Sequence, residues 1–161
     1  KKDVSSPTLS PSPTEVRKWK KIVSEKYSYS IEYPSQIDEA DSALRHPEVA
    51  ELVSLDALRV FVHAANQEEL VDYVNREWKN NREHNPYLKN KKVGDIEESD
   101  LAGEKAYHFT VTENIDFESN WEKIDQEYIM IYVKKNNYIY LIAYPKTDLQ
   151  YQKIASTFTL L

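Results

Sequence analysis

The sequence predicts an α+β fold, a three-layer α/β/α sandwich with a central antiparallel sheet. In residues 126–145, two runs rich in Tyr, Ile and Val flank the polar tetrad at 134–137, a pattern typical of a β-hairpin. Along the chain, three strand patterns, a helical pattern, four strand patterns and a second helical pattern follow one another with short links. This order favours antiparallel strands with helices packed on them.

The hairpin is the clearest element, and its turn sets its register. Asn136 and Asn137 can supply the two positive-φ positions of a type I′ turn. The pairs expected on one face are Val133 with Tyr140, Ile131 with Ile142 and Ile129 with Tyr144. The other face carries Tyr128, Met130 and Tyr132 against Ile139, Leu141 and Ala143. Because both faces are apolar, we expect the hairpin in the middle of the sheet with cover on both sides.

Two short strands are expected near the start, at residues 19–23 and 27–33. The second alternates apolar and polar residues, which predicts one buried and one wet face, with Pro34 ending the strand. The alternating residues are Tyr29, Ser30, Ile31, Glu32 and Tyr33. Residues 35–54 show no clear pattern, and residues 57–64 alternate as a further strand.

The period then changes to that of a helix. Asn66, with Glu69 three residues on, predicts a capping box and a helix through about Glu83, and Pro86 forbids its continuation. Leu70, Tyr73, Val74, Trp78 and Asn81 recur at helical spacing. We expect Tyr73 and Trp78 to be buried against a sheet face.

The second half of the chain predicts more strands and a final helix. Residues 91–97 indicate a weak strand, residues 100–103 a turn, residues 104–113 a strand and residues 114–125 a polar loop. After the hairpin, Asp148 predicts the N-cap of a C-terminal helix. Its apolar stripe is Tyr151, Ile154, Ala155 and Phe158.

Composition limits the function. The 161 residues fit one domain, and the two glycines disfavour Gly-rich phosphate loops. The absence of cysteine excludes thiol catalysis and disulfides, and no apolar run is long enough to span a membrane. Residues 1–26 carry seven Lys or Arg and three Asp or Glu, whereas the rest of this chain of net charge −6 is acidic. An acidic body disfavours nucleic-acid binding.

The first 17 residues are interpreted as a flexible tether rich in Ser, Pro and Thr, and residues 18–161 as a single domain. A frayed terminus is the alternative interpretation of the first segment. Because the sequence begins at Lys1 and not at Met, we expect a leader to precede it. The Ser, Pro and Thr composition favours a tether between a membrane anchor and the folded domain.

Candidate metal ligands and catalytic residues form no specific motif. The four histidines have no metal-site spacing, although His63 and His108 would become neighbours if their strands paired. The acidic runs at 95–100 and 113–127 could bind calcium or manganese but lack EF-hand spacing. No Gly-flanked nucleophile elbow occurs. We therefore predict no catalytic residue, no metal ligand and no cofactor.

Two aromatic residues in the polar loop, Phe117 and Trp121, either fold back onto the core or dock a partner. If a binding edge exists, the loop through Lys123 is its first candidate, with the basic segment starting at Arg17 and Lys18 as a charged neighbour. These five residues are the hypothesised partner-binding set.

Several of these segments resemble PsbP-like domains. The residues that carry the resemblance are Trp19, the run KYSYSIEYP at 26–34, the run LAGEKAY at 101–107, the tyrosine-rich hairpin and the run IASTF at 154–158. The resemblance covers about residues 18–161, with Ile37 standing where the family often carries Trp. It implies the Mog1/PsbP/DcrB-like fold, an α/β/α sandwich, and an action through protein partners without catalysis. Bacterial members are often lipoproteins on a spacer like residues 1–17.

We therefore expect a monomeric, non-catalytic, extracytoplasmic protein-binding or assembly domain tethered to a bacterial membrane. The partner is not identified by the sequence. The alternative is a small-ligand or divalent-metal binding module that uses the acidic loops.

Overall fold

The computed structural model describes residues 18–40, 49–80, 88, 91–116 and 123–161. Its elements in chain order are β1 (Trp19–Ser24), β2 (Tyr29–Pro34), β3 (Glu39–Ala40), β4 (Val49–Leu55), β5 (Leu58–Ala64), α1 (Leu70–Asn75), the π-helix η1 (Arg76–Asn80), β6 (Lys91–Val93), β7 (Glu97–Leu101), β8 (Glu104–Asp116), β9 (Lys123–Lys135), β10 (Tyr138–Pro145), α2 (Leu149–Ala155) and β11 (Thr159–Leu160). The class is α+β, as the sequence predicts.

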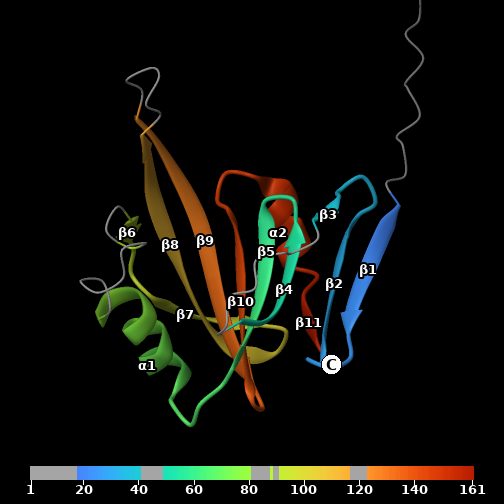
Figure 1. The fold of residues 1–161 in the computed structure, drawn as a ribbon, viewed down its shortest axis with the longest axis horizontal. Helices are drawn as coiled ribbons and strands as arrows, with labels where there is room; N and C mark the ends of the chain where they lie inside the picture. Colours follow the sequence, from blue (N-terminus) through green and yellow to red (C-terminus); the bar gives the residue numbers. More distant parts are fainter. Residues whose placement is uncertain (1–17, 41–48, 81–87, 89–90, 117–122) are drawn as a thin grey trace, which may run out of the picture.

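The strands of the described chain form two antiparallel sheets. The large sheet has eight strands in the order β3-β4-β5-β10-β9-β8-β6, with β7 also paired to β8. The small sheet has three strands in the order β1-β2-β11. Figure 1 shows β1 and β2 on the right of the molecule, and β8 and β9 rising to the upper left.

The predicted hairpin is confirmed in the middle of the large sheet. Val133 pairs with Tyr140, Ile131 with Ile142 and Ile129 with Tyr144, in the register expected from the sequence. The predicted turn type is wrong. Asn136 has the positive φ of 54°, but Asn137 is not among the described residues with positive φ, and a type I′ turn needs both.

One face of the large sheet is covered by the small sheet together with α2. The buried residues of this first core come mainly from β2, β5, β10 and α2 and their flanks, with one residue each from β4, β8, β9 and β11. They are Tyr27, Tyr29, Ile31, Tyr33, Ile37, Leu55, Leu58, Val60, Val62, Ala106, Val133, Tyr140, Ile142, Tyr144, Tyr151, Ile154, Ala155, Phe158 and Leu160. The cover on this face is therefore a second sheet as well as a helix, which the sequence did not predict.

The opposite face carries α1. Leu70 and Val74 of this helix pack against the other side of β8, β9 and β10. The sheet residues of this second core are Phe109, Val111, Met130, Tyr132, Ile139 and Leu141. Tyr73 and Trp78 pack against it but are half-buried, and the Trp78 indole donates a hydrogen bond to the Tyr132 hydroxyl at 2.7 Å.

Buried phenols tie the small sheet and α2 to the large sheet. The Tyr29 hydroxyl donates to Glu51 Oε1 at 2.6 Å, and the Ser24 hydroxyl donates to the other oxygen of the same carboxylate at 2.9 Å. Tyr33 donates to the Glu39 carboxylate. In the same way, Tyr151 of α2 donates to the carboxylate of Asp56, in the turn between β4 and β5. Hydrogen bonds to charged acceptors are stronger than neutral ones, so these contacts hold the cover in one position.

The first helix begins later than predicted. Glu69, and not Asn66, is the N-cap residue, it makes no side-chain capping hydrogen bond, and the chain becomes a π-helix at Arg76. A long-range contact explains the late start, because Lys134 of β9 donates to the carbonyls of Asn66 at 3.4 Å and Glu68 at 2.7 Å. The predicted end at Glu83 lies outside the described residues.

Strand boundaries also differ from the prediction. The unassigned region at 35–54 contains β3 and β4, and the short β11 follows α2. The predicted loop at 114–125 is shorter, because β8 runs to Asp116 and β9 starts at Lys123. The weak strand at 91–97 is two strands, β6 and β7. Between them the Gly94 amide donates to the carbonyl of Thr110 at 2.8 Å, and a Cβ on Gly94 would lie 3.2 Å from that oxygen.

The wet face predicted for the second strand is confirmed at Glu32 and wrong at Ser30. Ser30 is buried, because it lies between Val23 of β1 and Thr159 of β11 in the small sheet. Of the residues of β2, Glu32 alone is exposed.

Truncation of Ile142 tests the importance of the two-sided hairpin. This side chain is fully buried at the centre of β10, so Ile142→Ala should lower the free energy of unfolding by about 2–5 kcal/mol. Leu149→Ala is the matched control, because Leu149 is 77% exposed at the start of α2 and its truncation should change stability by less than about 0.5 kcal/mol. Urea denaturation measures both, and equal effects would contradict the core described here.

Alkaline pH tests the buried phenols. Burial, reinforced by the Asp56 carboxylate, raises the pKa of Tyr151 from 10.0 to about 12, and burial is also the main cause that raises the pKa values of Tyr29 and Tyr132. These phenols stay neutral in the folded chain while those of the unfolded chain ionise. Their stabilisation is therefore complete below about pH 10 and is lost as the pH rises through the folded pKa values. Tyrosinate absorbance should rise in a second step that coincides with loss of circular dichroism. A single step near pH 10 with the fold retained would contradict this.

Candidate functional site

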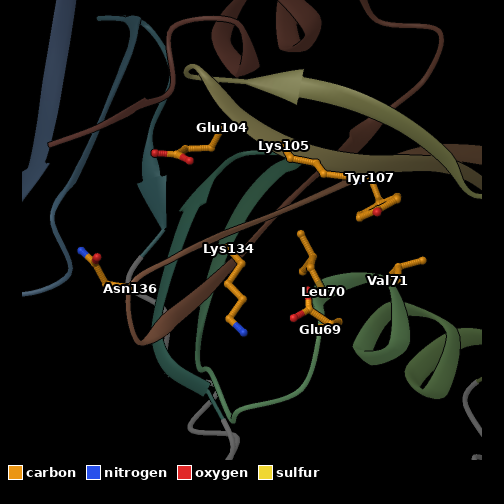
Figure 2. A pocket seen from close by; sticks show the side chains of 8 residues that line it. All are labelled: Glu69, Leu70, Val71, Glu104, Lys105, Tyr107, Lys134 and Asn136. Atoms are coloured by element: carbon orange, nitrogen blue, oxygen red, sulfur yellow. The ribbon is translucent and has the colours of Figure 1, made fainter.

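Two of the hollows on the surface of the described residues lie on opposite faces of the large sheet. The first has a volume of about 380 Å³ and lies between the start of α1 and the strands β8 and β9 (Figure 2). Its lining residues are Glu69, Leu70, Val71, Glu104, Lys105, Tyr107, Lys134 and Asn136.

Three of the four charged groups that line this first hollow have partners. Lys134 reaches the segment that leads into α1 and bonds its carbonyls, and Lys105 pairs with Glu98 at 2.7 Å. Glu104 pairs with Lys135 at 3.4 Å, and Figure 2 shows the Glu104 and Asn136 side chains pointing away from α1. The polar contacts around the first hollow, above all those of Lys134, therefore hold α1 on the sheet.

The second hollow, which we call the His108 groove, has a volume of about 350 Å³. Its lining residues are Ser99, Asp100, His108, Ile129, Ile131, Tyr144, Lys146 and Gln152. It lies on the face of the first core, because Tyr144 belongs to that core and Ile129 and Ile131 pack against it. The first core lies mainly on β5 and β10 of the large sheet. The groove lies next to this region, on β7, β8 and β9.

His108 is the distinctive group of the groove. It lies opposite Ile131 on β9 and opposite Glu97 on β7, and its Nε2 is 3.6 Å from the Glu97 carboxylate. Its Nδ1 is the only buried side-chain nitrogen or oxygen among the described residues without a hydrogen-bond partner. A polar atom left in this state costs about 1–3 kcal/mol.

The rest of the groove combines apolar and polar surface. Ile129 and Ile131 are half-buried and form an apolar floor. Burial raises the pKa of Tyr144, so its hydroxyl remains protonated at neutral pH and can donate a hydrogen bond. Lys146 stands at the rim in an ion pair with Glu127 at 3.0 Å. Such a surface can bind a group that is partly apolar and carries a hydrogen-bonding end.

The groove lacks the geometry of a nucleophile activated by a base. No described hydroxyl lies within hydrogen-bonding distance of His108 Nδ1, and its other nitrogen faces the Glu97 carboxylate. A nucleophilic site would place a hydroxyl or thiol on one imidazole nitrogen and an orienting group on the other.

The structure does not bring His63 and His108 together. Strands β9 and β10 lie between β8 and β5. The two imidazoles are also on opposite faces, because His63 stacks with Phe61 and lies near Tyr73 on the α1 side. The prediction that these histidines could become neighbours is therefore wrong.

Several acidic residues of the two runs make local contacts in the described part of the chain. On β7, Glu97 faces His108 and Glu98 pairs with Lys105, while the Asp100 carboxylate accepts the Gly103 amide in the following turn at 3.2 Å. Glu113 pairs with Lys91 at 3.6 Å. Across the described ranges, no group of three or more His, Asp or Glu side chains is placed to hold a metal ion.

The hypothesised partner-binding residues do not form one described surface. Arg17, Phe117 and Trp121 lie outside the described residues. Lys18 is exposed just before β1 in the small sheet, whereas Lys123 begins β9 in the large sheet. Figure 1 shows β1 at the right and the joined ends of β8 and β9 at the upper left, so these two elements are not neighbours.

Sequence reasoning missed the His108 groove. Its lining comes from five separate segments, and the strand pairing that joins β7 to β8 was not predicted. One signal was available, since the alternation in residues 104–113 placed His108 on the face opposite Tyr107 and Phe109.

Comparison with solved structures identifies the fold. The solution structure of cyanobacterial PsbP (CyanoP) from Synechocystis sp. PCC 6803 matches 97% of this chain and 100% of its own, with a TM-score of 0.64 and 12% identity. The fold is PsbP-like. A crystal structure of PA94, a protein of unknown function from Pseudomonas aeruginosa, matches 84% of this chain and 87% of its own, with a TM-score of 0.44 and 12% identity.

No family model and no curated protein matches the sequence. In the described part of the chain, neither helix is long and apolar enough to cross a membrane.

Replacement of His108 separates a binding role from a structural one. His108→Leu removes the unsatisfied nitrogen and extends the apolar floor, so the free energy of unfolding should stay the same or rise by up to about 1 kcal/mol. His63→Leu is the matched control, because it removes ring contacts with Phe61 and Tyr73 and should destabilise. Urea denaturation measures both variants. A larger loss for His108→Leu than for His63→Leu would make His108 a structural residue.

Proposed function

We propose that this chain is a non-catalytic binding or assembly domain of the PsbP-like type, an α/β/α sandwich in which the small sheet shares one outer layer with α2. The likeness to cyanobacterial PsbP over the whole of both chains supports this proposal. So does the resemblance in the first strands, the hairpin and the last helix, which implies action through protein partners.

The observation that carries the proposal is the unsatisfied Nδ1 of His108 above the half-buried Ile129 and Ile131. Natural proteins satisfy nearly all buried polar groups, so an unsatisfied one requires an explanation, and the explanation proposed here is a partner that completes it. The His108 groove is the proposed contact with the partner protein.

The domain is proposed to act outside the cytoplasm of a bacterium, held to the membrane by an anchor that precedes the tether. Residues 1–17 support this, because three prolines, four serines and two threonines with few apolar residues cannot form a core and suit a spacer. Fractionation of cells that express the full-length gene should place the chain with the membranes, and recovery in the soluble cytoplasm would contradict the tether.

Site-specific photo-crosslinking tests the groove as the partner contact. A photoreactive phenylalanine analogue at Gln152, an exposed residue of the groove on α2, should give a discrete adduct in living cells. The same analogue at Asp72, exposed on α1 across the sheet, is the matched control and should give none. His108→Leu should abolish the Gln152 adduct. The same adducts from both positions, or none from Gln152, would contradict the proposal.

A second function, binding of a small ligand, is favoured by the volume of the groove, about 350 Å³, which is in the range of ligand pockets. A thermal-shift panel with metabolites, sugars and divalent cations tests it. A ligand at about 100 times its Kd should raise Tm by roughly 5–10 °C. A shift that His108→Leu removes would favour this function over a protein partner, and a flat panel would remove it.

A further inference from the structure

The outer edge of the small sheet is formed by β1, and we propose that this edge docks an acidic, extended segment of a partner protein as a fourth antiparallel strand. The inference rests on the proposed function, because it requires a protein partner. It names a second contact surface, separate from the His108 groove, and the chemistry of the segment that fits it.

The edge is open along its length. Strand β1 pairs with β2 alone among the described strands. The direction of its backbone groups follows from one hydrogen bond, in which the Ser35 amide donates to the carbonyl of Lys18 at 2.8 Å. Antiparallel pairs alternate between bonded and non-bonded, so Lys20, Ile22 and Ser24 also face β2.

The intervening residues therefore turn their backbone outward. Trp19, Lys21 and Val23 direct their N–H and C=O groups away from β2, towards the open edge. The partner of Trp19 is Pro34, which has no N–H and so fits a non-bonded pair. An added strand would find the alternate donors and acceptors that β-strand addition uses.

The side chains on this edge define what can be added. Between Lys18 and Lys26 the chain carries four lysines and one glutamate, although the whole chain has a net charge of −6. Lys21 is half-exposed and pairs with Glu32 at 3.9 Å, a distance at which an exposed pair is weak and can be exchanged for a new one. Val23 is 50% exposed, which is unusual for an apolar residue in a strand and offers apolar contact to a neighbour.

The positive charge of β1 determines which kinds of strand could pair with this edge. Lysines on an edge strand repel basic strands and are costly to bury beneath neutral ones, which protects against aggregation, but the same charges attract a strand with carboxylates opposite them. A second copy of β1 in antiparallel pairing centred on Lys21 would place Lys21 against Lys21, which disfavours self-association through this edge. The complementary segment carries acidic residues opposite Lys20 and Lys21 and apolar residues opposite Trp19 and Val23.

Titration of the full 161-residue chain with a designed peptide tests this surface. The probe is the acetylated, amidated peptide Thr-Val-Thr-Glu-Glu-Val-Thr, followed by NMR of the 15N-labelled chain. Saturable shifts should be confined to the amides of β1 and β2, and Lys21→Glu should weaken binding about tenfold. The matched peptide with both glutamates replaced by lysine should not bind.

Two further reagents test strand pairing. Lys21→Pro removes an outward N–H while the hydrogen bonds to β2, made by Lys20 and Ile22, remain, and it should abolish binding with little change in Tm. The peptide methylated at the backbone nitrogen of its first glutamate should also fail, which keeps the test valid if Lys21→Pro does not fold.

Equal binding of the lysine peptide, binding that survives the methylation, or shifts centred away from β1 would each overturn the inference. The inference would also be overturned if sedimentation showed a dimer that dissociates in the Lys21→Glu variant, since the edge would then bind a second copy. A crosslinked partner at Gln152 with no peptide binding at β1 would contradict this inference but leave the groove proposal intact. Peptide binding at β1 without any crosslinked adduct at Gln152 would contradict the groove proposal and leave the inference about the β1 edge standing.

Discussion

The structure depends on a hairpin that is apolar on both faces. Strands β9 and β10 place residues such as Ile142 on one side and Leu141 on the other, and both sides are buried. A half-exposed sheet could not contain such strands, because one apolar face would remain in water. The rest of the chain supplies the two covers, α1 on one side and the small sheet with α2 on the other. The position of the hairpin in the middle of eight strands follows from the same need.

Tyrosine hydroxyls supply hydrogen bonds between these layers. A phenol buries a large apolar ring but also carries a hydroxyl that must find an acceptor. In the first core the acceptors are carboxylates and carbonyls at the rim, such as Glu51 for Tyr29 and the carbonyl of Tyr27 for Tyr140. Each bond joins two layers that are far apart in sequence. The hydroxyls thus set where the small sheet sits on the large one, a constraint that apolar contact alone would not give because it has no direction.

Local patterns predicted the parts of the fold whose causes are local. The register of β9 and β10 follows from the position of the turn and the period of two, and Asp148 caps α2 through the amide of Gln150. The start of α1 was missed because Lys134, more than sixty residues away, holds the carbonyls of Asn66 and Glu68. The ends of β8 and β9 were missed because residues 114–125 are mostly polar, and the pairing of these two strands joins residues that no local period relates. The separate small sheet depends on the non-local pairing of β2 with β11, which no local period reveals.

The groove could not be predicted for a related reason, and that reason also explains why it exists. Of the nine residues that the large sheet contributes to the first core, β5 and β10 supply three each, and β4, β8 and β9 supply one each, which in β8 is Ala106. Beyond that point the same sheet face continues through Ile129, Ile131 and His108 with partial cover. Because the sheet is wider than the layer that covers it, a row of residues on this face is left only half-buried. In such a row an imidazole nitrogen can be buried by its neighbours and still lack a hydrogen-bond partner, because the groups that would bond it in a full layer are absent. The candidate site is thus a product of the mismatch between an eight-stranded sheet and a cover of three short strands and one helix.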